Sequence, residues 1–140
     1  MTFGIYHSNV SFETQGEIEI IDLTNKLASL VSELNIKNGT LTVFNPGSTG
    51  AITAMEYEPG AVEDFKRLIK ELAPKGANWL HDRIDNNAHS HLRAALIGPS
   101  LTIPIRNGEL VMGTWQQPVF LELDIHPRRR RLQVTILGEK

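Results

Sequence analysis

The region after residue 100 constrains the fold most, because it consists of consecutive strand patterns with no helical pattern between them. Apolar residues alternate across 101–105, and Asn107-Gly108 is the dipeptide most typical of a tight β-hairpin turn. Pro118 indicates a strand start or a sheet edge, because proline lacks the backbone N–H that a central strand uses. The last alternating run is 132–136. Strands joined by hairpins pair antiparallel, so the sequence favours a sheet-rich α+β domain over a doubly wound parallel sheet.

The first hundred residues add three helices to this sheet. Between residues 23 and 34 apolar side chains recur every three or four positions, which is typical of a half-buried helix, and 62–72 shows a similar stripe before Pro74. A chain of 140 residues and 15.6 kDa fits one domain spanning 1–140. Strands are predicted at 3–12 with an irregularity near Ser8-Asn9, and at 17–21, 40–44 and 49–58; helices are predicted at 23–34, at 62–72 and over Leu92, Ala95 and Leu96, ending at Gly98.

The absence of cysteine narrows the chemistry that the chain can perform. Disulfides, thiolate zinc sites, iron–sulfur clusters and a Cys nucleophile are excluded, so a metal must be bound by His, Asp or Glu. Lys and Arg total 14 against 16 Asp and Glu, a net charge of −2, which argues against nucleic acid as a partner. With no signal peptide and no run of about 18 apolar residues, we expect a cytoplasmic protein with no membrane partner.

The densest group of reactive side chains is Asp85-Asn-Asn-Ala-His89-Ser-His91-Leu-Arg93. Imidazole is the commonest protein metal ligand, and His81 lies ten residues before His91, so His81, His89 and His91 are candidate ligands for a divalent ion such as zinc. On a regular helix, residues two apart lie about 200° around the axis. Either the helix therefore begins near His91, or only one of the two histidines faces the site. Histidines that are exposed or bonded to neighbours explain the spacing equally well.

Three further segments carry weaker signals. Gly47-Ser48-Thr49-Gly50 joins two strand patterns and could bring backbone N–H groups and two hydroxyls to a phosphate, although a simple bend explains it as well. Glu56 and Glu58 would share one face of an extended strand, where Glu56 could act as a general base or the pair could simply be exposed. Without Arg128 to Arg131 the balance is 10 positive against 16 negative charges, or −6, so this run is best explained as a solvated or inter-subunit charge cluster.

The segment Asn87-Ala-His-Ser-His-Leu-Arg-Ala-Ala-Leu-Ile-Gly-Pro-Ser100, together with Leu110-Val-Met-Gly-Thr-Trp-Gln-Gln117, closely resembles the YjbQ-like family, often called the secondary thiamine-phosphate synthase family. The resemblance extends over nearly the whole chain. It implies an α+β fold with a β-sandwich-like core of antiparallel or mixed sheets, a homotrimer, and a metal- or anion-binding cleft. It also implies an activity that joins a pyrimidine pyrophosphate to a thiazole phosphate, or else a small-molecule or metal-binding protein in which that activity is incidental.

Position by position, the resemblance implies that His81 and His91 bind the metal, and it places His89 at a position that only some members fill with His. Ser48 and Thr49 match a hydroxyl pair, and Gly47 stands where many relatives carry a His. Arg93 matches a basic position that suits a phosphate, because its guanidinium can bond two oxygens at once. Trp115 would stack on a flat ring or fill the core. The expected catalytic residues are Glu56 and Arg93, and the expected substrate-binding residues are Ser48, Thr49, Arg93 and Trp115.

Overall fold

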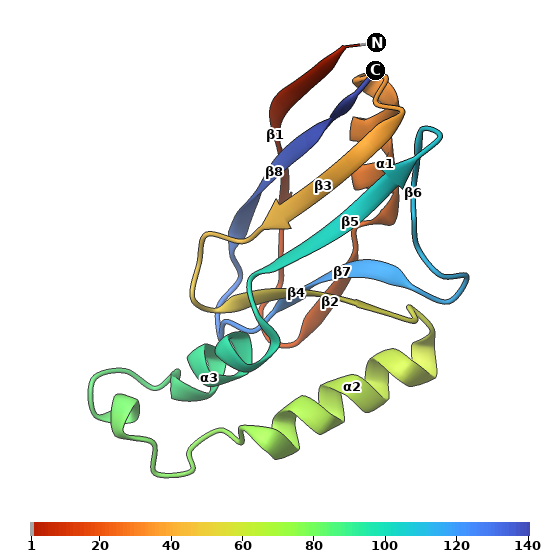
Figure 1. The fold of residues 1–140 in the computed structure, drawn as a ribbon. Helices are drawn as coiled ribbons and strands as arrows, with labels where there is room; N and C mark the ends of the chain where they lie inside the picture. Colours follow the sequence, from red (N-terminus) through yellow and green to blue (C-terminus); the bar gives the residue numbers. More distant parts are fainter. Residues whose placement is uncertain (1) are drawn as a thin grey trace.

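The chain forms two antiparallel sheets in the computed structural model, which describes residues 2–140 (Figure 1). Sheet A has the order β1-β8-β3-β5-β6, and sheet B has the order β2-β7-β4. The strands of sheet A are β1 (Phe3–Glu13), β8 (Arg129–Glu139), β3 (Asn38–Phe44), β5 (Ser100–Arg106) and β6 (Glu109–Leu110), and those of sheet B are β2 (Glu19–Asp22), β7 (Gln117–Glu122) and β4 (Gly50–Met55). Every strand pair is antiparallel, which confirms the predicted α+β fold class.

Four helical segments among residues 2–140 complete the fold. They are α1 (Thr24–Glu33), α2 (Pro59–Leu72), the 3₁₀ helix η1 (Leu80–Arg83) and α3 (Ala88–Ile97). Figure 1 shows α2 and α3 on one side of sheet B, with sheet A on the other. None of the helices in residues 2–140 is long and apolar enough to cross a membrane.

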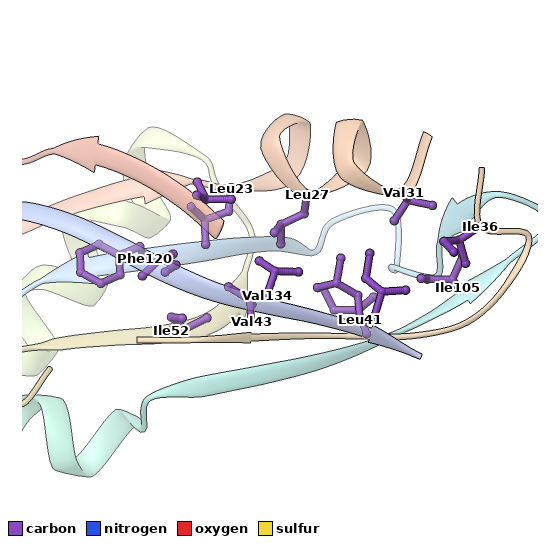
Figure 2. Packing of buried hydrophobic residues seen from close by; sticks show 14 residues of the cluster. Leu23, Leu27, Val31, Ile36, Leu41, Val43, Ile52, Ile105, Phe120 and Val134 are labelled. Carbon is purple, nitrogen blue, oxygen red and sulfur yellow. The ribbon is translucent and has the colours of Figure 1, made fainter. Parts of the chain in front are cut away.

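The main hydrophobic core lies between sheet A, helix α1 and one face of sheet B. Leu23, Leu27 and Val31 point from the α1 segment toward Leu41 and Val134 of sheet A (Figure 2). All five side chains are essentially excluded from solvent. The apolar stripe predicted over 23–34 is therefore the stripe that packs on the sheet, which explains why this segment is helical.

Strand β7 separates this core from a second one. Phe120 faces the first core, whereas Val119 and Leu121 face a cluster that includes Ile69 of α2 and Ala94 of α3. Alternation along β7 thus places both faces of one strand in apolar surroundings. Glu122 shares the parity of Phe120, so it lies at the edge of the first core with its side chain fully buried.

The hairpin predicted at Asn107-Gly108 is confirmed. Asn107 has φ 52° and Gly108 has φ 79°, the pair of positive values that a type I′ turn needs, and the turn joins β5 to β6.

Two local predictions differ from the structure, and a third is decided between its two alternatives. Strand β1 pairs with β8 in unbroken register from Phe3 to Glu13, so the irregularity predicted at Ser8-Asn9 is wrong. The apolar residues change parity along this strand because Phe3 and Ile5 lie on the outer face, where they are 71% and 63% exposed. The strand predicted over 49–58 ends at Met55, because Glu58 caps α2. Of the two alternatives predicted for Pro118, the strand start is confirmed: Pro118 is the second residue of β7, which is the central strand of sheet B and not an edge.

Candidate functional site

Helix α3 divides the predicted site into two faces. It begins at Ala88, so His89 and His91 both lie on regular helix and point in different directions. The spacing of His89 and His91 allowed two arrangements. The structure has the second one, in which only one of these two histidines faces a given site. His91, Ala94 and Ala95 share one face, and His89 and Arg93 share the opposite one.

The first face forms what we call the histidine cleft, a hollow of about 380 Å³. Backbone hydrogen bonds hold the β3–β4 connection against the end of α3, from Asn45 N–H to the Pro99 carbonyl at 2.8 Å and from Ile52 N–H to the Gly98 carbonyl at 3.0 Å. The cleft therefore combines a glycine-rich loop with a helix face. It is lined by Gly47, Ser48 and Gly50 on one side and by His91, Ala94 and Ala95 on the other.

His81 lies beside His91 although η1 and α3 are separate elements. The two ring centroids are 4.7 Å apart with the planes tilted by 49°. Two imidazoles bound to one zinc ion through bonds of about 2.1 Å have centroids roughly 5 Å apart, so this pair has a separation that fits a shared ion.

The third predicted ligand, His89, does not join this pair. Its ring is 0% exposed, and its Nε2 lies 2.8 Å from Glu17 Oε2. Among residues 2–140, no group of three or more His, Asp and Glu side chains lies close enough together to hold a metal ion. The structure therefore brings two of the three predicted ligands together, and no third His, Asp or Glu of the described residues joins them.

The opposite face of α3 forms what we call the arginine cleft, a hollow of about 390 Å³ lined by Glu17, Lys70, Pro74, Lys75 and Arg93. Arg93 is 3% exposed; its Nε donates to the Ala73 carbonyl at 2.9 Å, and its Nη1 donates to Glu17 Oε2 at 3.4 Å. Burial lowers the pKa of Arg93, and the charge of Glu17 opposes that shift. Arg93 thus lies in a different cleft from Ser48, so the predicted joint phosphate contact of these two residues does not form within one chain.

Three buried polar atoms at the start of α3 have no hydrogen-bond partner among residues 2–140. They are Asn87 Oδ1, His89 Nδ1 and Ser90 Oγ. Because a buried polar atom is normally paired, the first turn of α3 retains bonding capacity that the described residues do not use.

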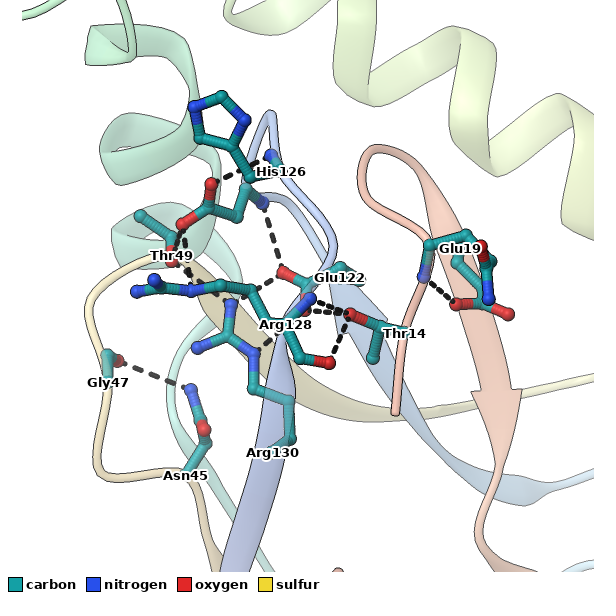
Figure 3. Close-up of polar contacts among 11 residues, drawn as sticks. Thr14, Glu19, Asn45, Gly47, Thr49, Glu122, His126, Arg128 and Arg130 are labelled. Carbon is teal, nitrogen blue, oxygen red and sulfur yellow. Dashed lines mark hydrogen bonds and ion pairs between the residues drawn. The ribbon is translucent and has the colours of Figure 1, made fainter. Parts of the chain in front are cut away.

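A buried polar network lies under the Gly47-Ser48-Thr49 loop (Figure 3). Arg130 donates from Nε to Glu122 Oε1 at 2.8 Å and from Nη2 to Glu122 Oε2 at 2.5 Å. Thr49 Oγ1 accepts from Arg130 Nη2 at 3.0 Å and donates to Asp124 Oδ2 at 2.9 Å. The Thr49 hydroxyl is therefore already engaged within the chain, whereas the exposed Ser48 borders the histidine cleft.

Asp124 connects this network to the surface. Burial by itself raises the pKa of Asp124, but hydrogen bonds from the His126 N–H and the Thr49 hydroxyl, together with the charges of Arg128 and Arg130, bring that pKa below its usual value. Asp124 therefore stays ionised and holds the Thr49 end of the loop.

Sequence reasoning missed Glu122, Asp124 and Glu17. A charged residue inside the apolar run 119–123 was a signal for a buried ion pair, because carboxylates are rarely buried without a partner. Arg130, the partner of Glu122, also corrects the prediction that Arg128 to Arg131 form one surface cluster. Arg130 is 6% exposed and bonds inside the chain, because inward-facing residues alternate with outward-facing ones along β8.

Glu56 and Trp115 lie outside both clefts. Glu56 is exposed after β4 and borders a third hollow of about 600 Å³ with Thr53, Asp64 and Phe65. Trp115 is 72% exposed in the β6–β7 connection, which Figure 1 shows at the far end of the molecule from α3. The chain therefore does not bring these two predicted residues to His91.

Comparison with known proteins gives a consistent result along the whole chain. The sequence pattern of the family described as UPF0047 protein YjbQ-like matches residues 8–139. A UPF0047 protein of Methanothermobacter thermautotrophicus is 39% identical over 135 residues, which are 96% of this chain and 94% of that protein. One of Archaeoglobus fulgidus is 38% identical over 128 residues, which are 91% of this chain and 98% of the other.

Solved structures show the same similarity. The crystal structure of a YbjQ-like protein from Sulfolobus solfataricus P2 superimposes with a TM-score of 0.94 at 38% identity, covering 99% of this chain and 100% of that one. A hypothetical protein from Aeropyrum pernix K1 gives a TM-score of 0.86, also at 38% identity, over 94% of this chain and 99% of the other.

Proposed function

We propose a function for this chain from its membership of the UPF0047 family of YjbQ-like proteins. In this proposal the protein is a metal-dependent enzyme that acts on a small phosphorylated substrate at the histidine cleft. The observation that carries the proposal is the His81–His91 pair, with ring centroids 4.7 Å apart. One of these rings lines the same hollow as Ser48.

The residues of the cleft have complementary roles in this proposal. His81 and His91 hold a divalent cation, most suitably zinc, with open positions left for water or substrate oxygen. The Ser48 hydroxyl donates to a phosphate oxygen, and the small residues Gly47 and Gly50 let the loop approach the substrate closely. When bound, the cation neutralises charge on a leaving pyrophosphate.

The reaction that we propose is of the secondary thiamine-phosphate synthase type, which joins a pyrimidine pyrophosphate to a thiazole phosphate. Ser48 and His91 then orient the pyrophosphate within the cleft. Glu56 and Trp115 take part only if a neighbouring copy supplies them, because within one chain they lie away from this cleft.

Metal content tests the ligand assignment. We expect His81→Ala and His91→Ala each to lower bound zinc well below one ion per chain, as measured by elemental analysis after dialysis against a limiting chelator. His7→Ala and His126→Ala are the matched controls, because both side chains are exposed and neither ring lies in the cleft. Full zinc retention in both the His81 and His91 variants would remove these ligands from the proposal.

Product formation tests the reaction. Zinc-loaded protein supplied with the pyrimidine pyrophosphate and the thiazole phosphate should release thiamine phosphate, and Ser48→Ala should lower the rate while leaving the fold intact. A dedicated synthase assayed in parallel shows that the assay works. No product from the zinc-loaded protein, with product from the dedicated synthase, would contradict the synthase proposal.

The competing function is a binding protein in which synthase activity is incidental. The observation in its favour is that the histidine cleft holds the His91 imidazole and the Ser48 hydroxyl, with His81 beside His91, a set sufficient for binding, whereas the predicted base Glu56 lies elsewhere. Thermal shifts with zinc, phosphate and thiamine precursors, without turnover of those precursors, would favour this second function.

A further inference from the structure

We propose that the arginine cleft is a second binding site, separate from the histidine cleft, for the phosphate group of a small phosphomonoester. The cleft has three cationic side chains, Lys70, Lys75 and Arg93, and one carboxylate, Glu17. The chain as a whole has a net charge of −2, so this concentration of positive charge is local.

Arg93 is already held in one orientation at the base of the cleft. Its Nε is bonded to the Ala73 carbonyl at 2.9 Å and its Nη1 to Glu17 at 3.4 Å, while the side chain is 3% exposed. No protein acceptor is found for Nη2 within residues 2–140. A fixed guanidinium with a free N–H group loses little entropy on binding an anion.

Glu17 offsets only part of this charge, because one carboxylate lines the cleft with three cationic side chains. Its Oε2 is shared between His89 Nε2 at 2.8 Å and Arg93 Nη1 at 3.4 Å.

The two lysines are free to bind. In residues 2–140, neither Lys70 nor Lys75 has a carboxylate within ion-pair distance, and the neighbouring Glu71 is paired with Arg67 at 3.5 Å. Both lysines are exposed, Lys70 in the last turn of α2 and Lys75 just after it, and both line the same cleft as Arg93, so their flexible side chains can reach a ligand there.

This geometry suits phosphate better than a carboxylate. A phosphomonoester has three terminal oxygens in a tetrahedral arrangement, which can accept from Arg93 and the two lysines at once, whereas a carboxylate has two oxygens in one plane. Because Arg93 and His91 lie on opposite faces of α3, a phosphate in this cleft does not contact the histidine cleft.

The probe for this site is inorganic phosphate, titrated at constant ionic strength and followed by ³¹P line broadening and by melting temperature. We expect saturable binding to the wild type, about tenfold or more weaker in the double variant Lys70→Gln/Lys75→Gln, because each lost hydrogen bond is charge-assisted. Acetate at the same ionic strength should bind far more weakly. The lysines are replaced rather than Arg93 because Arg93 links α3 to Ala73.

Two controls make the outcome specific. Lys26→Gln/Lys37→Gln removes the same charge from exposed lysines elsewhere and should bind phosphate as the wild type does. Ser48→Ala/His91→Ala removes the phosphate-binding groups proposed for the histidine cleft and should retain the part of the binding that depends on Lys70 and Lys75. Three results would each overturn the proposal. The first is no saturable phosphate binding to the wild type, in which case the basic residues only complement the C-terminal end of α2. The second is an equal loss of binding in both lysine variants, and the third is a loss of this lysine-dependent binding in the Ser48/His91 variant. None of these results bears on metal content or turnover, so the proposed function is tested separately.

Discussion

At the scale of single residues, the pair Arg130–Glu122 is a buried ion pair joined by two hydrogen bonds. Two hydrogen bonds join the guanidinium to the carboxylate, and Thr14 Oγ1 adds a third by donating to Glu122 Oε1 at 2.7 Å. The Arg130 guanidinium also lies 5.5 Å from the centre of the Phe120 ring. Each charge is therefore compensated where it is buried, which is the condition for burying it at all.

Removing one partner of this pair leaves the other charge buried and unpaired. We expect Arg130→Met to lower the free energy of unfolding by about 3–5 kcal/mol, measured by denaturant titration. Arg129→Met is the matched control, since the Arg129 side chain is 81% exposed and its loss should change stability by about 0.5 kcal/mol or less.

A double-mutant cycle with Glu122→Leu separates the pair from its surroundings. If Arg130→Met and the double variant Arg130→Met/Glu122→Leu are equally destabilised, the unpaired carboxylate is not the cause of the loss.

At the scale of elements, helix α2 begins where it does because of Glu58. The Glu58 carboxylate accepts from the Gly60 N–H at 2.7 Å and from the Ala61 N–H at 2.9 Å, and Pro59 occupies the first turn, where its missing N–H costs nothing. These two backbone hydrogen bonds lower the pKa of Glu58 below its usual value near 4.5. A residue predicted to lie on a strand thus becomes the N-cap of a helix.

The Glu58 cap predicts a specific pH dependence. Because its pKa is lower in the folded state, the stabilisation from the carboxylate is present above about pH 4.5 and is lost as the pH falls through the folded-state value. We expect Glu58→Gln to be less stable than the wild type at pH 7 and the difference to shrink toward acid pH, as measured by thermal unfolding. Glu63→Gln, on the exposed face of α2, should show no such convergence; a Glu58→Gln deficit that is constant with pH would contradict the role of the charge.

At the scale of the whole molecule, assembly as a homotrimer remains a prediction from the family resemblance. The arginine run can contribute only through its exposed members, since Arg130 is internal. Arg128 and Arg129 also have partners within the chain, Asp124 at 3.3 Å and Glu13 at 3.7 Å, but both side chains are more than half exposed. The Arg129–Glu13 pair is exposed on both sides, so it is weak and can be exchanged for contacts with a neighbouring subunit, whereas Asp124 is buried.

Sedimentation equilibrium tests the trimer. We expect a mass of about three times the 15.6 kDa chain at moderate salt, because closed cyclic symmetry sets the number of subunits. Arg129→Ser/Arg131→Ser should weaken assembly in a salt-dependent way, whereas Arg83→Ser/Arg106→Ser, which removes equal charge from other exposed positions, should not. A monomer mass independent of concentration would exclude the trimer, and a trimer insensitive to both pairs would exclude the arginines from the interface.

Much of the candidate site was predictable because its residues are neighbours in sequence. His89, His91 and Arg93 fall within five positions, so the sequence alone indicates a site that could bind a metal or an anion. Their division between two clefts was not predictable, since it depends on α3 beginning at Ala88 rather than near His91. A shift of the helix start by one turn would place His89 in extended backbone and change which face it occupies.

Local patterns determined several elements of this protein: the periodicity of 23–34, the turn at Asn107-Gly108 and the alternation of 132–136 each identify an element through interactions between near neighbours. Contacts between distant residues decided what those patterns leave open. Glu122 meets Thr14 across 108 positions, His89 meets Glu17 across 72, and β8 lies between β1 and β3. Burial of a charge or an imidazole depends on such distant partners, because its energy comes from desolvation and pairing in the folded state and not from the preference of any short segment.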